Sequence, residues 1–301
     1  MGKIAFVFAG QGAQQVGMGR DFYETFPAAK AAMDLLPQRL LQIMFDGPAE
    51  ELNQTANTQP CLFVTDLACA KLLNENGVFA NAVAGFSLGE IPALAYSGLM
   101  TEEEAFDFVC LRGAAMQACA DMRKGTMFAV LKLKAAEVET VCDIVQDAYP
   151  VNYNWEGQTV VACGLDSADA LVLAITKIGG KAIPLAVSGA FHSPLMAEAA
   201  AEIETYLSDK TFGQMKVPLY SNVTAQIYNE PKMLPALQVK RPVLWQKTIE
   251  NMISDGIDTF IEVGPGKTLS GLIKKINGDV KTLNVCDVSS LENTLMEVRN
   301  A

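Results

Sequence analysis

A serine with a glycine two positions away on each side sets the strongest limit on how this chain folds. The pentapeptide is Gly85-Phe86-Ser87-Leu88-Gly89, and it ends an apolar run at residues 83–86 and opens a helical stretch at residues 89–97. A strand, a G-x-S-x-G sequence and a helix in this order form a sharp turn that exposes a nucleophilic serine. The competing interpretation is a chance match in a glycine-bearing turn, so the motif has to be weighed with its partners.

The sequence offers Ser87 a single imidazole. Serine is a weak nucleophile at neutral pH and needs a base within hydrogen-bond reach, normally a histidine. His192 is the one histidine of the chain, so an imidazole base from this chain has to be His192. Taken alone, a histidine beside Phe191, Ser193 and Pro194 is more often a turn residue that its neighbours satisfy.

Acyl transfer also requires main-chain N–H groups that stabilise the oxyanion of the tetrahedral intermediate. The residue after the nucleophile usually provides one of them, and here it is Leu88. The turn Gly10-Gln11-Gly12, directly after an apolar run at residues 3–9, is a natural source of the second. A G-x-G turn by itself is weak evidence, because ordinary turns use the same residues.

Arg112 stands inside an apolar helical stretch at residues 106–119. A buried guanidinium must find a partner, and its planar fork binds a carboxylate through two hydrogen bonds. A substrate carboxylate is one such partner. An internal salt bridge, or an arginine whose head reaches the surface, is the alternative.

The order of apolar and helical stretches predicts an α/β protein with a parallel sheet. Strands are expected at residues 3–9, 83–86, 217–220 and 259–263, and helices at residues 49–53, 60–76, 89–97 and 101–121. Thr101 and Glu104 are spaced as a capping box for the last helix. A separate β-α-β-α-β layer is predicted from strand 127–133, helix 135–148, strand 159–163, helix 167–178 and strand 182–187.

Charge and cysteine spacing exclude several classes of function. The net charge is −11 and no long run of lysine and arginine occurs, so nucleic acid is not an expected partner. The apolar run at residues 4–9 is too short for a signal sequence or a membrane span, which predicts a cytoplasmic protein without a membrane partner. The seven cysteines are scattered without a C-x-x-C pair, so neither a disulfide framework nor a metal site is expected.

A series of motifs along nearly the whole chain resembles the ordered motifs of the malonyl-CoA:acyl carrier protein transacylase family. They are Val7-Phe8-Ala9-Gly10-Gln11-Gly12, Asn57-Thr58-Gln59-Pro60, Gly85-Phe86-Ser87-Leu88-Gly89-Glu90, Leu111-Arg112-Gly113, Ser188-Gly189-Ala190-Phe191-His192-Ser193 and Glu262-Val263-Gly264-Pro265-Gly266-Lys267. The resemblance implies a large α/β-hydrolase-like domain with a parallel sheet, residues 1–123 and 192–301. It also implies a small inserted ferredoxin-like α+β subdomain, residues 124–191, with the active site in the cleft between the two.

The resemblance further implies a reaction and the residues that carry it. A malonyl group moves from malonyl-CoA to the phosphopantetheine thiol of an acyl carrier protein, for fatty-acid rather than polyketide synthesis. Ser87 is the nucleophile, His192 the base, the N–H groups of Gln11 and Leu88 the oxyanion hole, and Arg112 the clamp on the malonyl carboxylate. No bound cofactor or metal is implied, and the expected state is a monomer.

Some positions depart from the family pattern. Phe86, Ala9 and Leu244 stand where the family usually has histidine, proline and glutamine. The family orients its histidine through a main-chain carbonyl in the segment 242–245, a contact that Leu244 can still supply. Phe86 is expected to reshape the pocket floor, and Phe191 resembles the residue associated with malonyl rather than methylmalonyl preference.

Two other classes of function remain open at this point. A serine thioesterase or esterase has the same turn but passes the acyl group to water, and it usually adds an acid between serine and histidine in the chain. The candidate acids are Asp143, Asp147, Asp166 and Asp169. A non-catalytic carrier-binding module would tolerate loss of Ser87 or His192, and the chain keeps both.

An acidic carrier protein would need a basic rim on this acidic enzyme. The candidate residues for that rim are Lys181, Lys240, Arg241, Lys274 and Lys275. A solvated charged face is the alternative interpretation of these residues.

Overall fold

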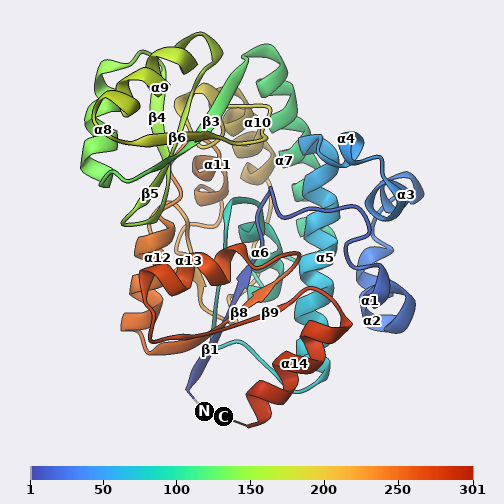
Figure 1. Ribbon diagram of the computed structural model, residues 1–301. Helices are drawn as coiled ribbons and strands as arrows, with labels where there is room; N and C mark the ends of the chain where they lie inside the picture. The colour runs from blue at the N-terminus through green and yellow to red at the C-terminus, as the bar shows by residue number, and fades with distance from the viewer. Residues whose placement is uncertain (1, 301) are drawn as a thin grey trace.

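The computed structural model describes residues 2–300, and its centre is a five-stranded parallel sheet (Figure 1). The strands are β1 (Lys3–Phe8), β2 (Ala82–Gly85), β7 (Leu219–Tyr220), β8 (Ile257–Val263) and β9 (Lys281–Val285), in the order β7-β2-β1-β8-β9. All neighbouring pairs run parallel. The predicted α/β class with a parallel sheet is confirmed. The sequence does not predict the edge strand β9, because it mixes polar and apolar residues.

β1 occupies the middle of this sheet because both of its faces are apolar. Ile4, Phe6 and Phe8 pack into one core, and Ala5 and Val7 pack into a second core on the opposite face. A strand that is buried on both faces is typical of parallel sheets covered by helices. The sheet is therefore the middle one of three layers.

Helices cover both faces of the parallel sheet. α12 (Trp245–Ser254) and α13 (Thr268–Ile276) share the core of Ala5 and Val7. The opposite core includes residues of α5 (Thr55–Glu75), α6 (Glu90–Ser97) and α7 (Glu102–Met122). The other helices around this sheet are α1 (Arg20–Thr25), α2 (Pro27–Met33), α3 (Gln38–Asp46), α4 (Ala49–Leu52), α10 (Ala197–Ser208), α11 (Leu234–Gln238) and α14 (Val288–Arg299).

The four helices predicted in the first part of the chain are present as α4, α5, α6 and α7. α7 begins with the expected capping box: the Thr101 hydroxyl accepts a hydrogen bond from the Glu104 N–H at 3.1 Å, and the Glu104 carboxylate accepts one from the Thr101 N–H at 2.9 Å. Both bonds satisfy N–H groups that the first turn of a helix otherwise leaves free. α7 carries Arg112, so its fixed start also fixes the position of that side chain.

A second, antiparallel sheet lies beside the first and at the top of Figure 1. Its strands are β3 (Gly125–Leu131), β4 (Ala148–Trp155), β5 (Gln158–Gly164) and β6 (Lys181–Pro184), in the order β4-β5-β3-β6. α8 (Ala135–Ile144) and α9 (Ala168–Lys177) share a core with β3 and β5. The boundaries at residues 124 and 191 stay a prediction.

The β-α-β-α-β order predicted for this segment is wrong by one strand. The structure has β-α-β-β-α-β, because residues assigned to the end of a helix and to the following loop form β4. Pro150 and two asparagines make this stretch look unlike a strand. Proline is tolerated here because β4 is an edge strand, and the pairing with β5 is irregular between Pro150 and Asn152.

Val243 ties the antiparallel sheet to the rest of the chain. The Tyr153 N–H donates to the Val243 carbonyl at 3.0 Å, and the Val243 N–H donates to the Val151 carbonyl at 2.8 Å. β4 is therefore held against a segment that leads into α12.

Of the helices among residues 2–300, none combines the length and the apolar character that crossing a bilayer demands.

Candidate active site

Ser87 stands at a sharp turn between β2 and α6, as the pentapeptide predicts. Its φ is 52°, in the left-handed region that non-glycine residues rarely adopt. The flanking glycines allow this turn, because a Cβ atom on Gly85 would overlap the Gly89 carbonyl group, and one on Gly89 would overlap the Phe8 carbonyl oxygen. This strand–turn–helix elbow, residues 85–89, is thus packed directly against the end of β1.

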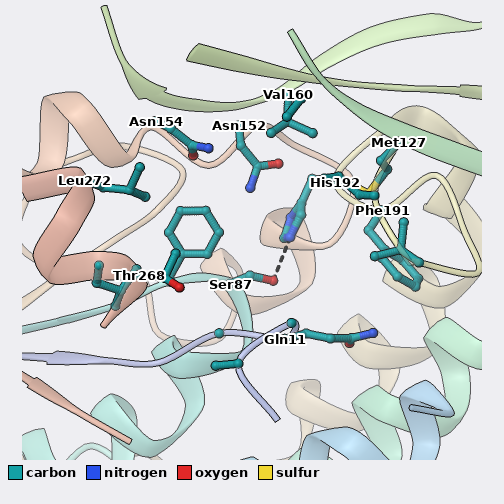
Figure 2. Close-up of a pocket in the computed structure, with 18 of the residues that line it drawn as sticks. Gln11, Ser87, Met127, Asn152, Asn154, Val160, Phe191, His192, Thr268 and Leu272 are labelled. Carbon is teal, nitrogen blue, oxygen red and sulfur yellow. Dashed lines mark hydrogen bonds between the residues drawn. The ribbon is translucent and has the colours of Figure 1, made fainter. Parts of the chain in front are cut away.

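The Ser87 hydroxyl and the His192 ring meet in one cavity (Figure 2). Ser87 Oγ lies 2.6 Å from His192 Nε2, and His192 Nδ1 lies 2.7 Å from the Gln238 carbonyl oxygen. A carbonyl only accepts hydrogen bonds, so Nδ1 carries the proton and Nε2 is free to accept from the serine. The expectation that residues 242–245 provide the orienting carbonyl is wrong, since Gln238 at the end of α11 provides it.

His192 is buried and uncharged at neutral pH. Burial, followed by the charge of Arg112, lowers its pKa to about 4, although the main-chain oxygens of Gln238 and Arg241 act in the opposite direction. A neutral imidazole with a free Nε2 is the form that accepts a proton from serine. The pair is therefore ready for nucleophilic attack.

Arg112 reaches the same point from α7. Its Nη1 donates to Gln59 Oε1 at 2.7 Å, and its Nη2 donates to Gln238 Oε1 at 2.8 Å and to Ser87 Oγ at 3.3 Å. The side chain is fully buried, and none of its partners in residues 2–300 is a carboxylate, so neither the surface arginine nor the internal salt bridge applies. Burial lowers the pKa of Arg112 to about 10, which leaves it charged at neutral pH.

The cavity above Ser87 has a volume of about 280 Å³ and lies between the two sheets. Its walls come from the elbow, the loop after β1, strands β3 to β5 and the start of α13. Gln11, Phe86 and Phe191 line it. Phe86 packs edge-on against Trp245, with ring centroids 5.3 Å apart, so this departure from the family pattern does form part of the pocket wall.

Of the two residues predicted for the oxyanion hole, Leu88 is next to Ser87 in the chain and Gln11 lines the same cavity as Ser87. Leu88 follows Ser87 and is fully buried, while Gln11 borders the cavity and its side-chain amide donates to Thr55 Oγ1 at 3.2 Å. Gly10 permits the close approach, because a Cβ atom there would lie 2.5 Å from the Phe86 carbonyl oxygen. Donation of their N–H groups to an oxyanion stays a prediction.

Asn222 is a site residue that the sequence did not reveal. Its Oδ1 accepts from the Ser87 N–H at 2.8 Å, and its Nδ2 donates to the Gly85 carbonyl at 2.7 Å. Asn222 follows β7, which pairs with β2, so its side chain is beside the elbow because the ends of parallel strands meet at one edge of the sheet. The available signal was a polar residue two positions after a predicted strand.

The buried Glu90 carboxylate holds Asn222 in place through a hydrogen bond. It accepts from the Asn222 N–H at 2.7 Å and from the Tyr228 hydroxyl. Burial raises the pKa of Glu90 to about 7, and the hydrogen bonds from Tyr228 and Asn222 counteract that rise. The elbow is therefore held by a chain of buried polar groups rather than by packing alone.

The acids offered for a hydrolase-type triad do not reach the site. All four are exposed, and none borders the cavity: Asp143, Asp147, Asp166 and Asp169.

Leu244 donates its N–H to the Asn222 carbonyl at 2.8 Å, and the Ala9 N–H donates to the Val263 carbonyl at 3.1 Å. Both departures from the family pattern thus keep a main-chain role beside the elbow.

Comparisons with known proteins assign a family. Residues 5–290 match the family of the acyl transferase domain. A malonyl CoA-acyl carrier protein transacylase of Bacillus subtilis is 37% identical, over 99% of this chain and 98% of the relative. A crystal structure of a transacylase with the same description from Clostridium perfringens superimposes with a TM-score of 0.94 at 38% identity, covering 99% and 98% of the two chains. The structure of a type II PKS acyl-carrier protein in complex with its malonyl-transacylase superimposes with a TM-score of 0.93 at 33% identity. The match covers 98% of this chain and 99% of the chain in that structure.

The lowered pKa of His192 predicts an acid limit of reactivity well below its ordinary value. We expect the labelling rate of Ser87 by a fluorophosphonate probe to fall as pH decreases through about 4, because His192 then becomes protonated. Arg112→Met removes a charge that lowers this pKa, so its limit should move to higher pH. An unchanged limit in the variant, with circular dichroism showing a folded protein, contradicts this assignment.

Asn222 predicts a second effect on the elbow. Asn222→Ala leaves the Ser87 N–H and the Gly85 carbonyl buried without partners, which costs about 1–3 kcal/mol for each group. We expect a drop of at least about 2 kcal/mol in the free energy of unfolding by urea and at least a tenfold slower labelling of Ser87. Ser221→Ala is the matched control, since this buried neighbour bonds Val223 instead. Equal behaviour of the two variants removes the proposed role of Asn222.

Proposed function

This chain belongs to the malonyl-CoA:acyl carrier protein transacylase family, and we propose that Ser87 carries the malonyl group between the two substrates. The enzyme transfers a malonyl group from malonyl-CoA to an acyl carrier protein. The observation that carries the proposal is the 2.6 Å contact between Ser87 Oγ and His192 Nε2. It supports a hydroxyl that gives its proton to a neutral imidazole.

In the first half-reaction the Ser87 oxygen attacks the thioester carbonyl while His192 Nε2 takes the hydroxyl proton. The tetrahedral intermediate then collapses, the carbon–sulfur bond breaks, and the proton on His192 passes to the sulfur of CoA. CoA leaves as a thiol and the malonyl group remains as an ester of Ser87. The Gln238 carbonyl keeps Nδ1 protonated and the ring oriented in both steps.

The second half-reaction uses the same groups in reverse. The carrier's phosphopantetheine thiol gives its proton to His192 and attacks the ester carbonyl. The carbon–oxygen bond breaks and the Ser87 oxygen recovers the proton. A covalent intermediate between two half-reactions gives ping-pong kinetics.

Arg112 is proposed to hold the malonyl carboxylate. Its Nη2 lies 3.3 Å from Ser87 Oγ, and its buried Nε–H lacks a hydrogen-bond partner among residues 2–300. A malonyl ester on Ser87 has its carboxylate one methylene from the reacting carbon, within reach of a guanidinium beside that oxygen. An acetyl group leaves the charged guanidinium without an anionic partner, which supports selection for malonyl.

The remaining pocket roles follow from the neighbourhood of Ser87. The N–H groups of Gln11 and Leu88 are proposed as the oxyanion hole, because Leu88 follows Ser87 in the chain, Gln11 lines the same cavity, and preorganised donors stabilise the charge that develops. Phe191, which is 5% exposed and borders the cavity, is proposed to restrict the space beside the malonyl methylene. Such a restriction favours malonyl over methylmalonyl.

Carrier docking is proposed to use basic residues near the cavity rim. Lys274 is a poor candidate, since its Nζ donates to the carbonyls of Gly278 and Val280 at 3.1 and 2.6 Å. Lys275 Nζ lies 4.6 Å from the centre of the Trp155 ring, and its side chain is exposed. The candidates for carrier docking are therefore Lys181, Lys240, Arg241 and Lys275.

We also propose that the carrier serves fatty-acid rather than polyketide synthesis. The enzyme is proposed to be a cytoplasmic monomer without a bound cofactor. The hydrolase-like and ferredoxin-like descriptions of the two layers are also proposed. The strand–helix elbow at Ser87 and the β-α-β-β-α-β order of the antiparallel layer support them.

Intact-mass analysis tests the covalent intermediate. Mixing with malonyl-CoA is expected to add one malonyl group to the native chain and none to Ser87→Ala, because within residues 2–300 Ser87 is the one hydroxyl paired with His192. Ser221→Ala serves as the control and should acquire the group. A malonyl adduct on Ser87→Ala, or its absence from the native chain, refutes the acyl-serine.

Arg112→Met tests the carboxylate clamp. We expect kcat/KM for malonyl-CoA to fall about a hundredfold, since hydrogen bonds to a charged group contribute about 1.5–3 kcal/mol. The value for acetyl-CoA should change much less, because acetyl has no carboxylate to lose. Misfolding would lower both kcat/KM values by the same factor, so the ratio of the two values is unaffected by it. A ratio equal to that of the native enzyme rules the clamp out.

A further inference from the structure

Arg112 and Glu90 are buried groups of opposite charge that a series of hydrogen bonds connects. Arg112 Nη2 donates to Gln238 Oε1 at 2.8 Å, and Gln238 Nε2 donates to Asn222 Oδ1 at 3.4 Å. The Asn222 N–H donates in turn to Glu90 Oε2 at 2.7 Å, and the Tyr228 hydroxyl donates to Glu90 Oε1. Every bond on the path from Arg112 to Glu90 therefore has its donor on the side of Arg112.

The two ends of this path fix its direction. A guanidinium has only donors, so the side-chain oxygen of Gln238 has to face Arg112. The amide nitrogen of Gln238 then faces the Ser87 carbonyl, at 2.9 Å, and Asn222. A carboxylate has only acceptors, which suits it to the other end. We call Arg112, Gln238, Asn222 and Glu90 the relay.

Burial couples the charges at the two ends of the relay. The side chains of Arg112 and Glu90 are both fully buried, where charges interact more strongly than in water. The titratable side chains that face Glu90 are Tyr228, from the loop after β7, and Arg112, from α7. Burial raises the pKa of Glu90 to about 7, while its hydrogen-bond partners and the charge of Arg112 act in the opposite direction. Glu90 thus depends on Arg112 to stay ionised.

We propose that Glu90 is the resident counter-ion of Arg112 and takes up a proton when a malonyl carboxylate reaches the guanidinium. This inference rests on the proposed function, in which Arg112 holds that carboxylate beside Ser87. The carboxylate offsets the positive charge that keeps Glu90 ionised, so a proton from solvent binds one Glu90 oxygen. When the malonyl group leaves on the carrier thiol, the O–H bond breaks and the proton returns to solvent.

This exchange keeps the buried region neutral in both states of the enzyme. Before loading, the charge of Arg112 is balanced by ionised Glu90. After loading, it is balanced by the malonyl carboxylate while Glu90 is protonated. An unpaired buried charge is costly, which favours the exchange over the simple addition of a second anion. Glu90 is therefore a positioning residue that acts through Arg112, and malonyl loading should weaken as pH rises through about 7.

Proton uptake during loading tests the assignment. The transfer of malonyl from CoA to a hydroxyl conserves protons, so any uptake comes from the protein. In a weakly buffered solution with a pH indicator at about pH 7.5, we expect about half a proton to be consumed per malonyl group, for a coupling of about tenfold. The methyl ester of malonyl-CoA is the matched control donor, because it releases the same thiol but brings no carboxylate. It should consume none, and intact mass counts the groups bound.

Three variants separate Glu90 from other buried acids. Glu90→Gln keeps an oxygen that can accept from the Asn222 N–H but carries no charge, so the uptake should disappear while the malonyl adduct still forms. Asp66→Asn is the control, since Asp66 is fully buried and neither of its carboxylate oxygens has a partner within residues 2–300. Its uptake should equal that of the native enzyme. Tyr228→Phe removes a donor that lowers the pKa of Glu90, so the pH of greatest uptake should rise.

Equal uptake from malonyl-CoA and its methyl ester by the native enzyme overturns the assignment, and so does native uptake by Glu90→Gln. The equilibrium constant for loading provides a second measurement. Between about pH 6.5 and 8.5 it should fall about sixfold relative to that of Glu90→Gln, because the loaded state binds more protons. An unchanged ratio also refutes the exchange. The proposed function fails separately, if intact mass shows no malonyl group on the native chain.

Discussion

The hydrogen bond from the Ser87 N–H to Asn222 Oδ1 is the contact on which the site depends. It holds a serine with φ of 52° in a conformation that costs about 1–3 kcal/mol for a residue with a side chain. His192 has a φ of 61°, so both members of the pair have left-handed backbones. Neither conformation would persist alone. Asn222, the Gln238 carbonyl and the glycines of the elbow fix them from the parallel-sheet side.

Electrostatics in this buried region favour negative charge on the ligand. Arg112 keeps its charge without a carboxylate partner among residues 2–300, and it contributes to the lowered pKa of His192. Glu90, the carboxylate that supports the elbow, has a raised pKa because burial disfavours its charged form. The field at Ser87 is thus set by a guanidinium, which suits both a malonyl carboxylate and an oxyanion.

The cavity exists because two sheets of different kinds meet. The parallel sheet supplies Ser87 and the turn after β1, while the antiparallel sheet supplies the amides of β4 and part of the apolar wall. Two main-chain hydrogen bonds at Val243 hold β4 against the segment that leads into α12. The Ser87–His192 pair therefore lies on one wall of the cavity, and β3 to β5 form the wall opposite.

The sequence by itself determined the buried centre of the sheet, the capping box of α7, the elbow at Ser87 and the choice of His192, because periodicity, turn chemistry and a single imidazole are local or unique signals. It misassigned β4, whose Pro150 is acceptable only at a sheet edge. Tertiary structure alone decided that Gln238 orients His192 and that Asn222 pins Ser87. The Gln238 contact uses a main-chain carbonyl, which every residue type has. Asn222 lies 135 residues from its partner, so its role depends on which strands become neighbours.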